Sequence, residues 1–164
     1  MEIYDNFLNK DYFNGICDFI MSSYFQQWAY CPKVAASEEN IVNSNYYFIH
    51  RLYEGNKPVS NEFSIIDGIV DKLECNSLIR ARILLYTNVG KFIKHGFHVD
   101  YNYKHKAALL YLNTCNGYTG FENDVKVESV ENRLVIFDGS THITAQLVLM
   151  NNQDMFFLSI ISNK

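Results

Sequence analysis

The sequence has 164 residues and a mass of 19.1 kDa, a length at which a folded chain buries about 70% of its unfolded surface. This length fits one compact domain and excludes two independent enzyme-sized domains. Hydrophobic residues make up 48% of the chain and charged residues 20%, which excludes intrinsically disordered and low-complexity proteins. The formal net charge is -4 without any cluster of Lys and Arg, so we expect neither nucleic acid nor an anionic membrane as a partner.

The cysteines and the first residues predict a cytoplasmic protein. Cys17, Cys31, Cys75 and Cys115 form no C-x-x-C pair, so we expect reduced thiols and no zinc knuckle. The opening MEIYDNFLNK lacks the basic and apolar regions of a secretory signal. No stretch approaches the roughly 18 apolar residues of a membrane helix.

The first part of the chain is predicted to be helical and mixed. Asn9 is a candidate cap for a helix over residues 11–23, where apolar residues recur at helical spacing. A second helix is predicted over 61–74 for the same reason. Aromatic and β-branched residues favour strands at 25–30 and 46–53.

From residue 77 the apolar period changes to two, which predicts a series of short strands with tight turns. Because no helix intervenes, we expect an antiparallel sandwich or barrel, a mainly β (α+β) fold with the helices packed outside. One domain is predicted over 1–164, with support over 1–76 and a β core over 77–164. The predicted strands are 77–87, 91–95, 97–101, 106–113, 118–122, 125–130, 132–137, 144–150 and 155–161.

Three residues of the β half form a candidate metal site. His98 and Asp100 are two apart, so on an extended segment their side chains point to the same face. His142 follows an apolar strand and a turn, and hairpins that fold back could bring it beside the first pair. Two imidazoles and one carboxylate are the facial triad of non-haem Fe(II) oxygenases. Alternatively, each is an ordinary hydrogen-bonded residue, since H-x-D alone is common.

Several motifs accompany this triad in a fixed order. They are RARILLYTNVGKF, the H-V-D of His98 to Asp100, ALLYLN, NGYTGF and VESVENRLVIFDGSTH, together spanning about residues 77–142. This stretch resembles the Fe(II)/2-oxoglutarate-dependent dioxygenases, in particular the prolyl-4-hydroxylase-like branch and its short phage and metagenomic versions. The resemblance implies a double-stranded β-helix, a jelly-roll or cupin-like fold, supported by N-terminal helices.

The same resemblance assigns roles to individual residues. It implies that His98, Asp100 and His142 are the iron ligands. It also implies that Tyr111 and Tyr86 contact 2-oxoglutarate. With 12 tyrosines in the chain, the alternative is that both are core or rim residues with satisfied hydroxyls.

The chain departs from the family where a cation is expected. Relatives place an Arg or Lys roughly ten residues after the distal His, where it pairs with the tail carboxylate of 2-oxoglutarate. Here that window reads LVLMNNQDMFFLS and contains no cation. On the strand over 77–87, Arg80, Arg82 and Tyr86 share one face, so Arg82 is the candidate substitute. The alternative is that Arg82 faces solvent.

The resemblance implies an oxidoreductase, a dioxygenase that hydroxylates a peptidyl (including prolyl) or small-molecule substrate with O₂. Fe(II) is the implied cofactor and 2-oxoglutarate the co-substrate, with ascorbate as an optional addition. The alternative is a catalytically silent β-barrel module that binds a metal or ligand after losing the 2-oxoglutarate anchor. His95 and His105 are expected to be solvent-exposed beside turns, or else to face the substrate.

Overall fold

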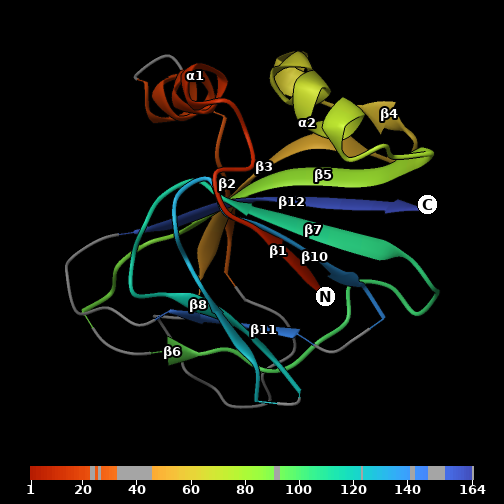
Figure 1. Ribbon diagram of the computed structural model, residues 1–164. Helices are drawn as coiled ribbons and strands as arrows, with labels where there is room; N and C mark the ends of the chain where they lie inside the picture. The colour runs from red at the N-terminus through yellow and green to blue at the C-terminus, as the bar shows by residue number, and fades with distance from the viewer. Residues whose placement is uncertain are drawn as a thin grey trace.

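Two β-sheets and a layer of helices make up the described part of the chain (Figure 1). The computed structural model describes residues 1–22, 25, 27–32, 46–90, 93–122, 124–140, 143–147 and 154–163. The larger sheet has eight strands, ordered β1 (Glu2–Tyr4), β10 (Leu134–Asp138), β7 (Lys106–Tyr111), β12 (Met155–Asn163), β5 (Ser77–Tyr86), β3 (Tyr47–Glu54) and β2 (Ala29–Cys31), with β4 (Lys57–Pro58) paired to β3. The smaller sheet has four, ordered β6 (Ile93–Lys94), β11 (Ile143–Leu147), β8 (Tyr118–Phe121) and β9 (Lys126–Glu128).

The strand order is that of a jelly roll. Every strand pair in the described residues is antiparallel, and neighbours in the sheets are mostly not neighbours in sequence. The strand β12, near the C-terminal end, lies between β5 and β7 in the middle of the larger sheet. The predicted jelly-roll fold is therefore confirmed.

The helices cover the outer face of the larger sheet (Figure 1). Helix α1 (Lys10–Met21) begins after Asn9, whose side chain accepts from the backbone N–H of Asp11 at 2.9 Å, as predicted. The helix predicted over 61–74 is divided into a 3₁₀ helix, η1 (Asn61–Ile66), and α2 (Asp67–Lys72). The change falls at Ile66, whose φ of -105° and ψ of 3° depart from helical values and whose side chain is fully buried against the sheet.

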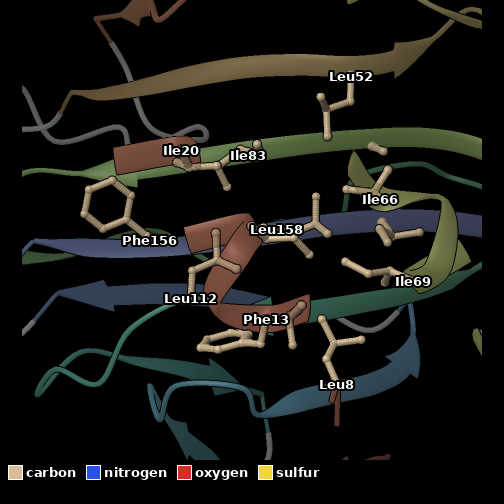
Figure 2. Packing of buried hydrophobic residues seen from close by; sticks show 14 of the residues in the cluster. Leu8, Phe13, Ile20, Leu52, Ile66, Ile69, Ile83, Leu112, Phe156 and Leu158 are labelled. Carbon is tan, nitrogen blue, oxygen red and sulfur yellow. The ribbon is translucent and has the colours of Figure 1, made fainter. Parts of the chain in front are cut away.

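Alternation along the strands of the larger sheet builds a separate apolar core on each face. Ile83 and Leu158 point toward the helices, where they pack with Phe13 and Ile69 (Figure 2). Tyr86 and Phe157 belong to the opposite core, which lies between the two sheets. The helix layer therefore packs on one face of β5 and β12, and the smaller sheet on the other.

The structure differs from the predicted strands in several places, among them the unpredicted β4. The segment predicted at 25–30 contributes only the short β2, and 97–101 forms a single bridge between His98 and Ile143 instead of a strand. Strand β1 was not predicted, because its exposed residues carry no alternating apolar signal. In the described residues, no helix has the length and apolar character needed to cross a membrane.

Candidate active site

A cavity of about 220 Å³ lies between the two sheets. The larger sheet supplies most of its wall, and the segment around His98, with Thr119 and Ile143, supplies the rest. Its lining residues are Tyr47, Arg80, Arg82, Leu84, Tyr86, His98, Asp100, Leu109, Thr119, Ile143, Phe157 and Ser159.

His98 and Asp100 lie together on the wall of this cavity. The backbone of His98 exchanges two hydrogen bonds with Ile143, each 2.9 Å long, which holds this segment against the smaller sheet. His98 Nδ1 lies 3.4 Å from the carbonyl oxygen of Gly96. That contact favours a proton on Nδ1 and leaves the Nε2 lone pair available for a metal.

Arg80 is the closest charged partner of Asp100. Its guanidinium Nη2 lies 2.6 Å from Asp100 Oδ1, and the same group lies 5.3 Å from the ring centroid of Tyr101. Arg80 is only 7% exposed, and its Nε has no hydrogen-bond partner among the described residues. Sequence reasoning placed Arg80 on the cavity face of its strand but missed its pairing with Asp100, because that pairing depends on how two distant segments pack.

Arg82 also lines the cavity and does not simply face solvent. It forms an ion pair with Glu54, while its buried Nε has no partner in the described residues. Across the sheet, Arg82 is paired in register with Ser159 of β12. Strand β12, which reads MFFLSIISN, carries no Arg or Lys, so the cations of this cavity wall come from the neighbouring strand β5.

Tyr86 is buried in the cavity wall, stacked between Tyr47 and Phe157 with ring centroids 5.3 and 5.7 Å away. Burial, with smaller contributions from Tyr47 and Asp100, raises the pKa of Tyr86 well above its ordinary value. The hydroxyl therefore stays protonated and can donate a hydrogen bond to an anion in the cavity.

Tyr111 is fully buried beside the cavity and is not among its lining residues. Its hydroxyl donates to Thr119 Oγ1 at 2.7 Å, and Thr119 does line the cavity. Burial raises the pKa of Tyr111 well above its ordinary value, so this donor also stays protonated. In the described residues, Tyr111 thus reaches the cavity indirectly, through Thr119 and through its ring contact with Phe157, and not as a lining residue.

The predicted third ligand, His142, lies outside the described residues. In the described part of the chain, no three His, Cys, Asp or Glu side chains group together as a metal site. The residue after His142 is Ile143, which pairs with His98, so the chain returns to the first two candidate ligands at this point. One imidazole and one carboxylate on a shared wall fit a divalent transition metal that still needs a further nitrogen ligand.

The other histidines of this region were predicted to be exposed, and that prediction is wrong. His95 is 2% exposed and packs against Tyr86, and His105 is 4% exposed and packs against the aromatic rings of Tyr101 and Tyr103. Neither is among the residues that line the cavity. Both lie in aromatic surroundings that bury the ring, which a pattern of turn residues does not reveal.

Comparison with known proteins gives a likeness in structure only. No family model and no curated protein matches the sequence. A prolyl hydroxylase from Trichoplax adhaerens, solved in complex with a peptide fragment of the hypoxia inducible factor oxygen degradation domain, is 16% identical with a TM-score of 0.70, covering 99% of this chain and 82% of that one. A prolyl-4-hydroxylase from Pseudomonas putida is 15% identical with a TM-score of 0.59, covering 99% and 92%. The non-heme alpha ketoglutarate dependent epimerase SnoN from nogalamycin biosynthesis is 10% identical with a TM-score of 0.64, covering 97% and 75%.

Proposed function

We propose that this chain, which has the fold of the prolyl-4-hydroxylase-like 2-oxoglutarate-Fe(II) oxygenases, is itself an Fe(II)- and 2-oxoglutarate-dependent dioxygenase. The observation that carries the proposal is that His98 and Asp100 both line one cavity, which two arginines also line. One fold can host many different reactions, so we infer the function from the residues of the cavity.

In this proposal His98, Asp100 and His142 hold the metal. Imidazole and carboxylate ligands suit Fe(II), which when bound would supply the activation of O₂, with 2-oxoglutarate as the reductant. The protein's own contribution is to fix the two described ligands: the bridge to Ile143 positions the His98 backbone, and Arg80 positions the Asp100 carboxylate.

The co-substrate 2-oxoglutarate would be held by the β5 face of the cavity. Arg82 is the proposed partner of its tail carboxylate, because its Nε is a buried donor without a partner among the described residues. Tyr86 would donate a second hydrogen bond to 2-oxoglutarate. Tyr111 would hold Thr119 in place through the hydrogen bond between their hydroxyls. This arrangement replaces the missing cation of the strand after His142.

For the primary substrate, we favour a peptide side chain over an enclosed small molecule. At about 220 Å³ the cavity is below the roughly 300 Å³ at which ligand pockets begin. With 2-oxoglutarate inside, little room is left for a complete metabolite. The peptide in the Trichoplax adhaerens complex supports the same choice. The four free cysteines agree with a reducing compartment, and we place the protein in the cytoplasm.

The decisive experiment is the release of succinate from 2-oxoglutarate by the purified protein with Fe(II), ascorbate and O₂. We expect slow uncoupled turnover in the wild type and none above background in His98→Ala. Thermal shifts with Mn(II) test the metal site separately, since a ligand that binds only the native state raises its stability. A shift retained in His98→Ala would contradict the metal assignment.

Arg82→Met tests the co-substrate anchor. Losing a charge-assisted hydrogen bond should raise the concentration of 2-oxoglutarate needed for half-saturation at least about tenfold. Arg51→Met is the matched control, because Arg51 also pairs with Glu54 but is not among the residues that line the cavity. Equal effects of the two variants would contradict the role of Arg82.

The alternative function is a silent binding module, which the cation-free strand β12 favours. It predicts metal binding without succinate release, and no tightening of Mn(II) binding when 2-oxoglutarate is added. Calorimetry of Mn(II) with and without 2-oxoglutarate separates the two functions.

A further inference from the structure

The proposed metal ligands come from two segments of the chain that have to be held together. His98 and Asp100 lie on one segment, and His142 lies between the turn at Gly139 and strand β11. At one end these segments are joined by the two hydrogen bonds between His98 and Ile143, each 2.9 Å long. A second connection is needed at the other end to fix their relative position.

His105 and Gly139 provide this second connection. The backbone N–H of Gly139 donates to the carbonyl oxygen of His105 at 2.9 Å, one residue beyond the ladder that ends at Lys106 and Asp138. The imidazole lies directly against Gly139, because a Cβ placed there would be 2.0 Å from His105 Nε2 and 2.2 Å from Cδ2. Only glycine fits beneath the buried ring.

The loop over residues 101–105 connects this contact to Asp100. The ring of His105 packs edge-on against Tyr101 at 5.7 Å, and its Nδ1 lies 2.7 Å from the carbonyl oxygen of Tyr103. Tyr101 in turn packs against the guanidinium of Arg80, which binds Asp100. Contacts therefore run without interruption from the Asp100 carboxylate to Gly139.

The surroundings of His105 argue against a direct role as a ligand. It is 4% exposed and lines a separate pocket beside Asp138, not the cavity that His98 and Asp100 line, and its Nε2 has no hydrogen-bond partner among the described residues. A buried imidazole nitrogen without a partner has a desolvation cost, which indicates that packing on Gly139 determines where the ring lies.

We propose that His105 is a positioning residue: its ring, seated on Gly139 and packed against Tyr101, fixes the turn at Gly139 relative to His98 and Asp100 before a metal binds. This inference rests on the proposed function, because it concerns the geometry of the proposed metal site. The relevant property is the affinity and coordination of the metal, which a purely structural residue would leave unchanged in the folded protein.

The test uses metal-stripped protein and compares Gly139→Ala, His105→Ala, His105→Phe and the double variant Gly139→Ala/His105→Ala. Mn(II) affinity is measured by calorimetry and the Co(II) visible spectrum records the coordination, both at a temperature where circular dichroism shows each variant folded. Gly15→Ala is the matched control, since no atom lies within 4 Å of its new Cβ.

We expect Gly139→Ala to bind Mn(II) at least about tenfold more weakly and to change the Co(II) spectrum, because the new Cβ displaces the ring or the turn. The double variant should regain much of this loss, since it removes the clash. His105→Phe keeps a ring on Gly139 and should bind more tightly than His105→Ala, a comparison that holds even if Gly139→Ala does not fold.

Two results would overturn the positioning role: wild-type affinity in both Gly139→Ala and His105→Ala, or His105→Phe as weak as His105→Ala. Failure of the proposed metal site looks different, because the wild type and Gly15→Ala would then bind neither Mn(II) nor Co(II). Failure of the dioxygenase function alone would leave Mn(II) binding intact without succinate release.

Discussion

Arg80 is the counter-ion of Asp100 in the cavity wall. It is buried, and its guanidinium balances Asp100, whose side chain is 22% exposed. A carboxylate that loses its counter-ion inside a protein is costly, whereas replacing both partners with neutral groups often is not. We therefore expect the loss of Arg80 alone to cost more stability than the loss of both charges together.

Arg80→Met should lower the free energy of unfolding by about 2–4 kcal/mol, because Asp100 is left partly buried without its partner. Urea unfolding at neutral pH measures the loss. The double variant Arg80→Met/Asp100→Asn should be more stable than Arg80→Met alone. A single variant within about 0.5 kcal/mol of the wild type would contradict the pairing.

Cys17 is a second residue whose chemistry is set by its surroundings. Its half-buried thiol donates to the carbonyl oxygen of Leu112 at 3.5 Å, and burial, with smaller effects of Asp18 and Glu131, raises its pKa to about 11. At pH 8 the thiolate fraction should fall about a hundredfold, so alkylation of Cys17 by iodoacetamide should be slower in the native than in the urea-unfolded protein. Peptide mass spectrometry measures both rates.

The same pKa gives a pH dependence of stability. The folded state keeps the Cys17 proton to higher pH than the unfolded state, so the free energy of unfolding falls as pH rises from the ordinary thiol range to about 11. Other groups also titrate there, so the comparison is with Cys17→Ala, in which this part of the slope should disappear. Identical slopes would contradict the raised pKa.

Among the elements, helix α1 has the start of its chain fixed to the larger sheet by the side chain of Asn132. Asn132 precedes β10 with a left-handed φ of 58° and is 6% exposed. Its Oδ1 accepts from the N–H of Leu8 at 2.8 Å and its Nδ2 donates to the carbonyl oxygen of Leu8 at 2.9 Å. These two bonds fix the chain immediately before the Asn9 cap.

Asn132→Ala should lower the free energy of unfolding by about 2–3 kcal/mol, because it leaves both polar groups of Leu8 without partners and keeps a strained φ. Asn56→Ala is the matched control: Asn56 has a φ of 62° but is exposed, so the strain of an alanine at a left-handed φ is the only effect expected there. Thermal unfolding compares the two. Equal losses would show that the bonds to Leu8 contribute nothing.

The elements that sequence predicted are those whose signals are local. The cap and apolar stripe of α1 are contained in a dozen residues, so the helix was found. Strand β1 was missed because its structure depends on pairing Glu2 with Ile136, far along the chain. The division between η1 and α2 was missed because it depends on the burial of Ile66 against a sheet formed elsewhere.

At the scale of the whole molecule, the two faces of the larger sheet have different roles: one packs in the core beneath the helices, and the other lines the cavity. Leu158 is 1% exposed in the core beneath the helices, and its neighbour Ser159 lines the cavity on the opposite face. The cavity face of β5 could be predicted because its residues alternate, whereas the partners of those residues could not, because they come from other strands and loops.

Leu158→Ala should therefore cost about 2–5 kcal/mol of stability while changing Mn(II) affinity by less than about threefold. Ser159→Leu should weaken Mn(II) binding while changing the free energy of unfolding little, because the larger side chain fills the cavity. Urea unfolding and calorimetry on both variants test this separation. A large loss of metal affinity in Leu158→Ala, measured where it is fully folded, would show that the two faces are coupled.

The central place of β12 in the larger sheet has a consequence for biosynthesis. Strands β5 and β7 leave the ribosome before β12 is made, yet in the described part of the larger sheet β12 is the strand that joins them. Until translation reaches residues 155–163, both present unpaired edges, and edges of this kind are prone to aggregation. The nascent chain should therefore complete the larger sheet, and with it the cavity wall that carries Arg80 and Arg82, only after β12 emerges.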